Sequence, residues 1–572
     1  MLLPTCTDPI ARCDHLARPK APCNRPHWTC VHLVTAMLAC SPALALAQTP
    51  PAGAGQLLEE TRRPAAPTLP SQAPPKVLEA PVRPSISMPE GLFVTVSGFR
   101  IIGAVSFAPD LLAGLIQPWV GKKLDIRGLN EAAGALTRHY QANGHLLSYA
   151  YLPAQRVADG VIELAVLEGR IEGAQIVTAQ DVRLRDEVVQ AHTDRVVGPG
   201  PALQPGVERQ LLLLNDIPGV TARAAFTPGA ATGGAEMVVS VAEDEPLEVR
   251  VDASNHGSVS TGQYRAGVSL QLRDLFGWGD SINARGMLSN RGGLVTGALS
   301  GSLPLGGDGW KLGASLSRLE YQLAGTFRNT GAQGKADTLG VDLGYPLLRS
   351  TSANLSLRAG LEHKRLRDDL VAILESTQKR NDVGELTAAF DFRDPLDGLA
   401  AGSATVSVGQ LRTAGQRRQE WRKLSAQLAR QQNLYGPWSV YTRLSGQTAG
   451  ANLDSSEKLG LGGANGVRAY APGEASVDHG VVASLEVRYS LDLLGGGLVA
   501  SLFHDYGGGQ INRSTPGAVG NDPELNGTGI GIAWSGNGIG LNATLAWRRS
   551  RVPTTDTRDP RPRLFFQVSY LP

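Results

Sequence analysis

The long C-terminal part of the chain, residues 246–572, contains no convincing helix pattern. Segments of roughly 8–12 residues alternate between apolar and polar side chains and are separated by Gly, Asp, Asn and Pro turns, which is typical of β-strands. In "VVASLEVRYSL", for example, Leu485 and Val487 share one face and Glu486 and Arg488 share the other. So long a run of strands, with charges on one face, indicates either a β-barrel in a membrane or a large soluble β domain.

Backbone polar groups cannot stay unpaired in lipid, so only helices and closed β-barrels span a membrane. After residue 47 no apolar run approaches the roughly 20 residues that a spanning helix needs. A spanning barrel carries apolar side chains outside and polar side chains in its lumen. At about 20 residues per strand and connection, this region would form on the order of 16 strands. We therefore expect an antiparallel transmembrane β-barrel of about 16 strands over residues 246–572.

The first 47 residues resemble a secretory signal peptide. Residues 12–25 form a basic region, Val31–Leu46 is a short apolar core, and Ala45-Leu46-Ala47 fits an A-x-A cleavage site. All five cysteines of the chain lie at or before Cys40, so cleavage after residue 47 would leave a mature protein without thiol or disulfide chemistry. A lipoprotein processed before Cys40 is the weaker alternative.

Three further regions separate this signal from the barrel. Residues 48–92 are rich in Pro and Ala and predict an extended linker, in which residues 56–63 could form a short helix. Residues 93–171 and residues 172–245 each show the order β-α-α-β-β. The repeated order predicts two small α+β modules in tandem.

Within these modules the pattern gives definite elements. In the first module we expect one strand over residues 93–102 and helices over residues 109–120 and 126–143. In the second module we expect helices over residues 181–193 and 205–216, followed by two strands.

No catalytic or cofactor site is expected. A net charge of +2 gives no support to a nucleic-acid partner, and no His, Cys, Asp or Glu cluster has the spacing of a metal site. The glycines of residues 526–542 alternate along a strand, and no helix follows, so a dinucleotide fingerprint is excluded. His504 adjoins Asp505, but adjacent strand residues point to opposite faces and cannot form a dyad. We expect no enzyme activity, cofactor or metal.

Several phrases are similar to a known family. They include "FRIIGAVSFAPDLLAGLI", "YLPAQRVADGVIELAVLEGRI", "GSLPLGGDGWKLGASLSRLEYQL" and, most specifically, "GLGGANGVRAY". With them, nearly the whole mature chain resembles the outer-membrane transporters of two-partner secretion, the haemolysin and filamentous-haemagglutinin transporter family. The resemblance implies two POTRA domains, over residues 93–171 and 172–245, and a 16-stranded barrel. It also implies a long sixth loop, here around residues 460–480, that folds into the lumen.

The family carries a V-R-G-Y motif at the tip of this loop and an F-x-D-x-G motif on a nearby strand. The residues that match are Val467, Arg468, Ala469 and Tyr470 in the loop and Phe503, Asp505 and Gly507 on the strand.

The strand period of two places Phe503, Asp505 and Gly507 on one face, which we expect to face the lumen. The resemblance implies that Arg468 pairs with Asp505 and packs near Phe503. Ala469 departs from the family's usual glycine, and it would be strained if that position required a positive φ.

The function implied is export of a protein. A large exoprotein with an N-terminal secretion domain would reach the POTRA domains unfolded, in the periplasm, and pass through the barrel without ATP. The transporter would be a monomer in the outer membrane, surrounded by lipid. The helix at residues 53–64 and the sixth loop would fill the resting lumen. Alternatives are a barrel-assembly factor of the same superfamily, a passive porin or receptor barrel, and a secreted β-rich hydrolase.

Overall fold

The computed structural model describes residues 52–62, 93–515, 518–549 and 560–572, together with the single positions 67, 69 and 78. The expected signal peptide and most of the expected linker lie outside the described residues. Among the described helices, none is long and apolar enough to cross a membrane.

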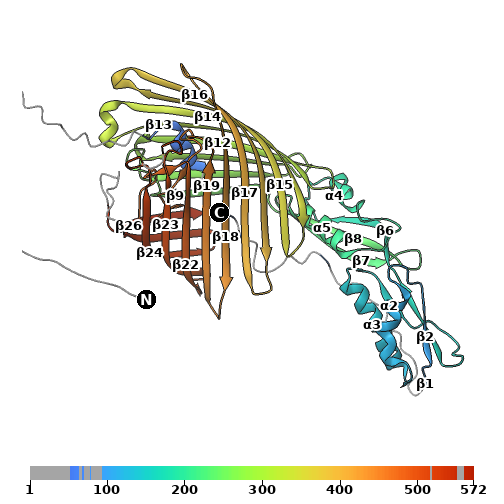
Figure 1. Ribbon diagram of the computed structural model, residues 1–572. Helices are drawn as coiled ribbons and strands as arrows, with labels where there is room; N and C mark the ends of the chain where they lie inside the picture. The colour runs from blue at the N-terminus through green and yellow to red at the C-terminus, as the bar shows by residue number, and fades with distance from the viewer. Residues whose placement is uncertain are drawn as a thin grey trace, which may run out of the picture. The chain divides into compact units, whose positions relative to one another are not determined.

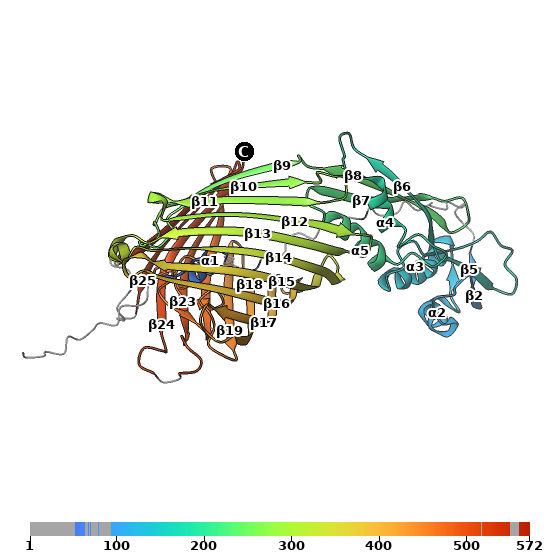
Figure 2. The ribbon, with the colours of Figure 1, turned by 90° about the horizontal axis from the view of Figure 1, so that it is seen from above.

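The C-terminal part forms one closed antiparallel barrel of sixteen strands (Figures 1 and 2). The strands are β9 (Leu247–Ser254), β10 (Arg265–Arg273), β11 (Ser281–Ser289), β12 (Leu294–Leu305), β13 (Trp310–Gln322), β14 (Ala332–Arg349), β15 (Ala353–Leu370), β16 (Glu375–Arg393), β17 (Gly398–Thr413), β18 (Gln419–Asn433), β19 (Trp438–Ala449), β22 (His479–Leu493), β23 (Gly496–Gln510), β24 (Glu524–Gly536), β25 (Ile539–Arg548) and β26 (Arg563–Tyr570).

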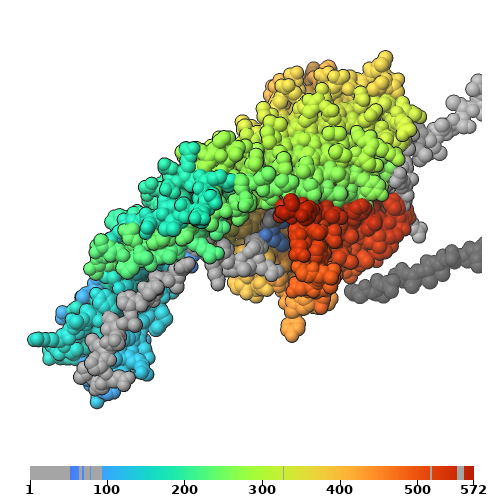
Figure 3. Space-filling model, turned by 180° about the vertical axis from the view of Figure 1, so that it is seen from behind, coloured from blue at the N-terminus to red at the C-terminus, as the bar shows by residue number. Residues whose placement is uncertain are grey.

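The ring closes where β26 pairs with β9, with Gln567 opposite Ser254. Figure 3 shows this junction from outside, where the red C-terminal strands lie directly against the green first strands. Closure leaves no unpaired edge in the barrel, which is the condition for a sheet in lipid. The predicted architecture, a mainly β fold with a 16-stranded antiparallel barrel, is confirmed.

Side chains alternate across the barrel wall as the strand period requires. On β15, Leu361 is 66% exposed on the outside, whereas Leu366 and Lys364 are buried toward the lumen. The strands are longer than the 8–12-residue segments that the polarity pattern indicates: β14 and β15 have 18 residues and β16 has 19. The difference arises because turn-forming residues such as Gly and Asp also occur inside long strands, where the ladder of a closed sheet holds them.

The first α+β module lies between residues 94 and 167. Its elements are β1 (Val94–Thr95), β2 (Gly98–Ile102), α2 (Pro109–Ile116), the 3-10 turn η1 (Gln117–Trp119), β3 (Lys123–Leu124), α3 (Ile126–Ala142), β4 (Tyr149–Tyr151) and β5 (Val161–Leu167). The expectation of one strand over residues 93–102 is wrong, because β1 pairs with β3 while β2 joins the sheet β2-β5-β4.

Helix α3 shows why these elements form. Asp125 caps its first turn by accepting a hydrogen bond from Gly128 N at 2.9 Å. Its apolar face, which includes Leu136 and Tyr140, is fully buried against the sheet. The helix stops before Gly144, whose φ of 82° continues the chain in a left-handed turn.

The second module has the order β6 (Arg170–Thr178), α4 (Asp186–Thr193), α5 (Gln204–Asn215), β7 (Val220–Pro228) and β8 (Gly234–Glu243). Its sheet order is β6-β8-β7, with β6 parallel to β8. Helix α4 begins five residues later than the expected residue 181, because Asp181 itself has a φ of 66° and turns the chain.

Candidate functional site

The connection between β19 and β22, residues 450–478, folds back into the barrel and is called loop six below. Two short strands, β20 (Leu459–Gly460) and β21 (Ser476–Val477), pair within it and form its stem. Its tip is packed rather than solvated: Val467 and Tyr470 are both fully buried, in a cluster that includes Phe503 on the barrel wall. The structure therefore brings the loop motif and the strand motif together.

Arg468 and Asp505 form a bidentate ion pair. Arg468 Nε donates to Asp505 Oδ2 at 2.9 Å and Nη2 donates to Oδ1 at 2.7 Å, while the backbone N–H of Arg468 also donates to Oδ2 at 3.0 Å. Asp505 is fully buried and Arg468 is 8% exposed. Parallel hydrogen bonds of this kind are stronger and more directional than a single contact, so the pair fixes both the position and the orientation of the loop tip.

Three neighbours complete the surroundings of Arg468. Ser484 on β22 accepts from Arg468 Nη2 at 2.8 Å and donates to Asp505 Oδ1 at 2.7 Å. Glu486 lies 2.8 Å from Arg468 Nη1. The guanidinium carbon lies 3.4 Å from the ring centroid of Phe503, which is cation–π geometry. One arginine is thus held by two carboxylates, a hydroxyl and an aromatic ring.

Two small residues let the loop approach the wall. A Cβ on Gly507 would lie 2.9 Å from Val467 Cγ2, and a Cβ on Gly527 of β24 would lie 2.5 Å from the methyl group of Ala469. Ala469 is not among the described residues with a positive φ, so it carries no backbone strain. The hydroxyl of Tyr470 has no hydrogen-bond partner among the described residues, so this residue acts through its buried ring.

A second polar cluster holds the stem of loop six and was not found from the sequence. Glu457, nearly fully buried, accepts from Lys364 of β15 at 2.6 Å, from Asn381 of β16 at 2.8 Å and from Lys423 of β18 at 2.8 Å. Nearby, Asp454 accepts from a lysine of β16 at 2.7 Å. Lysines at lumen-facing strand positions were the signal in the sequence that could have predicted this cluster, because buried cations require acidic partners.

Helix α1 (Ala54–Arg62) lies against the inner wall on another side, where the blue helix is enclosed by strands in Figures 1 and 2. Its apolar residues join a buried cluster with inner-wall residues of β12 to β15. Its polar contacts include two ion pairs at 2.6 Å, Glu60 with Arg265 and Arg62 with a glutamate of β15. They also include hydrogen bonds from Ala54 N to Asp368 at 2.7 Å, from Arg62 to a threonine of β14 at 2.8 Å and from Gln56 to a carbonyl of loop six at 3.2 Å.

These contacts hold both loop six and α1 against the inner wall of the barrel. Among the described residues there is no group of three or more His, Cys, Asp or Glu side chains that could hold a metal ion.

Breaking a buried ion pair by removing one partner costs about 3–5 kcal/mol, because the other charge stays buried without compensation. Loop six is therefore strongly fixed through the buried carboxylates of Asp505 and Glu457, whereas the ion pairs of α1 use less buried side chains of the helix, 16% exposed for Glu60 and 34% for Arg62.

A family model described as "Haemolysin secretion/activation protein ShlB/FhaC/HecB" matches residues 233–534, and a second, "POTRA domain, ShlB-type", matches residues 94–169. The chain belongs to the ShlB/FhaC/HecB family of haemolysin secretion/activation proteins. The transporter is 28% identical over 456 residues to the "Heme/hemopexin transporter protein HuxB" of Haemophilus influenzae, covering 76% of this chain and 80% of that one.

It is also 24% identical over 437 residues to the "Outer membrane transporter CdiB" of Escherichia coli, covering 70% of each chain. A solved structure of CdiB from Escherichia coli superposes with a TM-score of 0.67 at 20% identity, covering 86% of the transporter and 94% of that chain. BamA from Haemophilus ducreyi, solved without POTRA domains 1–3, gives a TM-score of 0.51 at 14% identity, covering 83% and 100%. The two structures show the shared fold.

Family and fold together give the general function. The transporter is an outer-membrane pore of two-partner secretion, with its POTRA domains in the periplasm, and it exports a secreted exoprotein partner.

Proposed function

We propose that the exoprotein passes through the barrel lumen after α1 has left it, while loop six stays fixed to the wall throughout. The observation that carries this proposal is the difference between the two lumen segments. Loop six is held by the buried Arg468–Asp505 pair at its tip and by Glu457, which contacts three strands, at its stem. Helix α1 has nine residues, and its two ion pairs use less buried partners, so it is the easier segment to displace.

We further propose that the two modules over residues 93–171 and 172–245 receive the unfolded cargo by β-augmentation. Strands β2 and β4 are edges of the first sheet, and β6 is an edge of the second. An extended peptide can add to such an edge through main-chain hydrogen bonds, while neighbouring pockets select side chains. The other edge of the second sheet, β7, already bridges to Leu78 of the linker region, in parallel. This occupied edge makes β6 the better docking edge of the second module.

The energy for export would come from the cargo itself. We propose that the transporter works as a monomer, performs no catalysis and uses no nucleotide, and that folding of the exoprotein outside the cell draws the chain outward. Among the alternatives, a barrel-assembly factor shares the fold, as the likeness to BamA illustrates. An assembly factor would change the amounts of many outer-membrane proteins when removed, whereas a dedicated exporter would change release of its partner.

The test is a secretion assay that compares bacteria with the transporter and bacteria without it. The full chain is co-expressed with a large exoprotein that carries an N-terminal secretion domain, and released exoprotein is measured with and without the transporter. We expect release to depend on the transporter, and Arg468→Ala to reduce it strongly while the barrel still assembles. Arg417→Ala, in the exposed connection between β17 and β18, is the matched control and should release normally.

Barrel assembly is checked by the heat-dependent shift in gel mobility. Equal release without the transporter would overturn the export function. Normal release by a correctly assembled Arg468→Ala variant would leave export standing and remove the anchoring role of loop six.

A further inference from the structure

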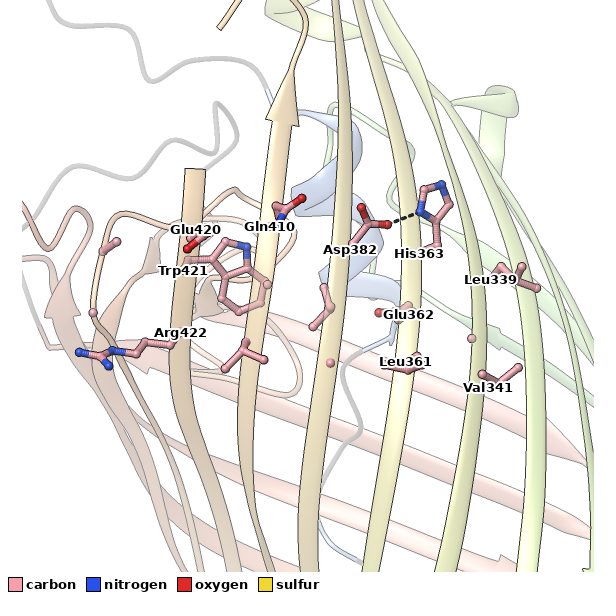
Figure 4. Close-up of a pocket in the computed structure, with 17 residues that line it drawn as sticks. Leu339, Val341, Leu361, Glu362, His363, Asp382, Gln410, Glu420, Trp421 and Arg422 are labelled. Carbon is pink, nitrogen blue, oxygen red and sulfur yellow. Dashed lines mark hydrogen bonds and ion pairs between the residues drawn. The ribbon is translucent and has the colours of Figure 1, made fainter. Parts of the chain in front are cut away.

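A groove of about 890 Å³ lies on the outer face of strands β14 to β18 (Figure 4). Its apolar part is one cross-strand row, in which Val341, Leu361, Gly384 and Val408 are neighbours on successive strands. Because Gly384 has no side chain, space remains between its neighbours: a Cβ there would lie 3.7 Å from carbons of both Leu361 and Val408. This apolar part of the groove is therefore an outward-facing aliphatic surface that a hydrocarbon chain can occupy, while His363, Asp382 and Glu420 are among the polar residues that line the rest.

Four residues further along each strand, the outer face carries three arginines side by side. Arg365 is directly opposite Arg380, and Arg380 is directly opposite Arg412; these three are called the arginine row. All three are exposed. Opposite side chains in antiparallel strands have Cβ atoms about 4.5–5.5 Å apart, and like charges there are destabilising. Asp337 stands opposite Arg365 at one end of the row, but it also faces Arg318 at 3.4 Å.

The protein itself neutralises this row only in part. Arg365 Nε donates to His363 Nε2 at 3.1 Å, and Asp382 lies 2.5 Å from His363 Nδ1 (Figure 4) and 3.9 Å from Arg412. The side chain of Arg380, in the middle, makes no hydrogen bond or ion pair with the described residues. The centre of the row therefore lacks a counter-charge from the chain.

The arginine row lies at the end of the barrel away from the POTRA domains. Three residues separate Glu243, where β8 of the second module ends, from Leu247, where β9 begins, so that end of the barrel faces the periplasm. The arginines lie near the opposite ends of their strands, close to Leu370, Glu375 and Thr413. They are thus placed on the outer-leaflet side, directly beyond the apolar groove.

We propose that the arginine row binds phosphate groups of a phosphorylated glycolipid of the outer leaflet, and that one acyl chain of this lipid lies in the groove. The guanidinium group matches phosphate oxygens with two parallel hydrogen bonds and remains charged at any physiological pH. A phosphate between adjacent arginines converts their mutual repulsion into attraction. The groove places a hydrocarbon chain on the membrane side of the same lipid. The site is on the outer wall and is separate from the lumen and from the export function.

The test uses the full chain refolded into detergent without lipid, and native mass spectrometry to measure binding of a bis-phosphorylated lipid A. Three probes accompany it: the same lipid without phosphates, phosphatidylethanolamine, and inorganic phosphate. Two variants separate the two parts of the site, namely the triple change R365Q/R380Q/R412Q and the groove-filling G384L. The matched control is R291Q/R328Q/R549Q, which removes three exposed loop arginines outside the row.

We expect phosphorylated lipid A to bind at least about tenfold more tightly than the dephosphorylated lipid or inorganic phosphate, and the triple variant to lose that advantage. The loop control should bind like wild type. G384L should weaken binding of phosphorylated lipid A, because the new side chain fills the groove, and it should leave the weak binding of inorganic phosphate unchanged. Equal binding by the triple variant, equal binding of the dephosphorylated lipid, or equal loss in the loop control would overturn the proposal. Should the triple variant fail to refold, normal binding by G384L would overturn it alone.

Discussion

At the tip of loop six, the methyl group of Ala469 fills the space that a side chain at Gly527 would occupy. Ala469 is 2% exposed, and its methyl lies 2.5 Å from where a Cβ of Gly527 would be. We predict that Gly527→Ala will loosen the loop by about 1–3 kcal/mol, the usual cost of overpacking. The measurement is protease cleavage of loop six in the assembled barrel. Ala469→Gly alone should change little, because Ala469 has no positive φ to relieve.

The double change supplies the control for this prediction. Ala469→Gly removes the clashing methyl, so Gly527→Ala should be largely tolerated in its presence, although the new Cβ also lies 3.2 Å from Trp547 O. The two changes should therefore be strongly non-additive. Simple additivity would show that the two residues do not meet in solution.

Glu168 gives the first POTRA domain a dependence on pH. Burial alone would raise the pKa of this carboxyl, but hydrogen bonds from the Ser106 hydroxyl, from the N–H groups of Ser106 and Val105 and from the Tyr140 hydroxyl together lower its pKa below the ordinary 4.5. The pKa of Tyr140 is raised, first by burial and then by Glu168. Because the carboxyl pKa is lower in the folded state, its stabilisation is complete above pH 4.5 and is lost as the pH falls through the lowered value.

We predict that Glu168→Gln will destabilise the connection at residues 103–107 by about 1 kcal/mol at neutral pH, a modest value because the group is partly exposed. Hydrogen exchange of this segment in the whole protein is the measurement. The variant and wild type should converge as the pH drops well below 4.5. Glu131→Gln, on the exposed side of α3, is the control, and an equal effect there would contradict the assignment.

Single residues also show what a sequence can and cannot predict. The period of two places Asp505 and Phe503 on one face, and the structure has both buried on the lumen side. Glu457 could not be found in this way. Its partners Lys364, Asn381 and Lys423 come from three strands, and only the closed strand order brings them to one loop residue.

At the scale of elements, helix α1 is the segment whose displacement the structure makes easiest. We predict that Glu60→Ala with Arg62→Ala will raise the open probability of the pore several-fold, because both ion pairs of α1 are lost and Arg265, whose side chain is 7% exposed, is left without Glu60. Conductance in planar bilayers is the measurement. Gln56→Ala is the control, since the side chain of Gln56 makes a single hydrogen bond to the described residues, to Gly473 O at 3.2 Å. Unchanged conductance in the double variant would argue that α1 does not limit opening.

Element boundaries differed in how far local signals determine them. The face and ends of α3 follow from residues within the helix and its caps, so the expected residues 126–143 agree closely with Ile126–Ala142. The division of the first strand into β1 and β2 could not be predicted from local residues, because it depends on the pairing of β1 with β3, which lies further along the chain. Long strands such as β16 were underestimated because neighbouring strands, not turn residues, decide their ends.

At the scale of the whole molecule, engineered disulfides can test which lumen segment, α1 or loop six, moves during export. All five cysteines lie in the first 40 residues, so engineered cysteine pairs in the described part of the chain meet no native thiol there. Val467 and Gly507 are one suitable pair, because a Cβ on Gly507 would lie 2.9 Å from Val467 Cγ2. Gly53 and Asp368 are another, since a Cβ on Gly53 would lie 3.5 Å from Asp368 Cγ. In a cysteine the sulfur occupies the γ position, so a short distance from the Cβ of one residue to a γ carbon of the other suits a disulfide at both sites.

We predict that these two disulfides, called the loop-six lock and the α1 lock, will have opposite effects on release of the exoprotein. Val467→Cys with Gly507→Cys ties the tip of loop six to the wall, and release of the exoprotein should continue in the oxidised state because the loop is already a fixed anchor. Gly53→Cys with Asp368→Cys ties α1 inside the lumen, and release should fall to a small fraction and return on reduction. Each single cysteine variant is the control for its pair. If the loop-six lock blocked release and the α1 lock did not, the roles would be reversed, and the Arg468–Asp505 pair would be a latch that opens with every exported chain.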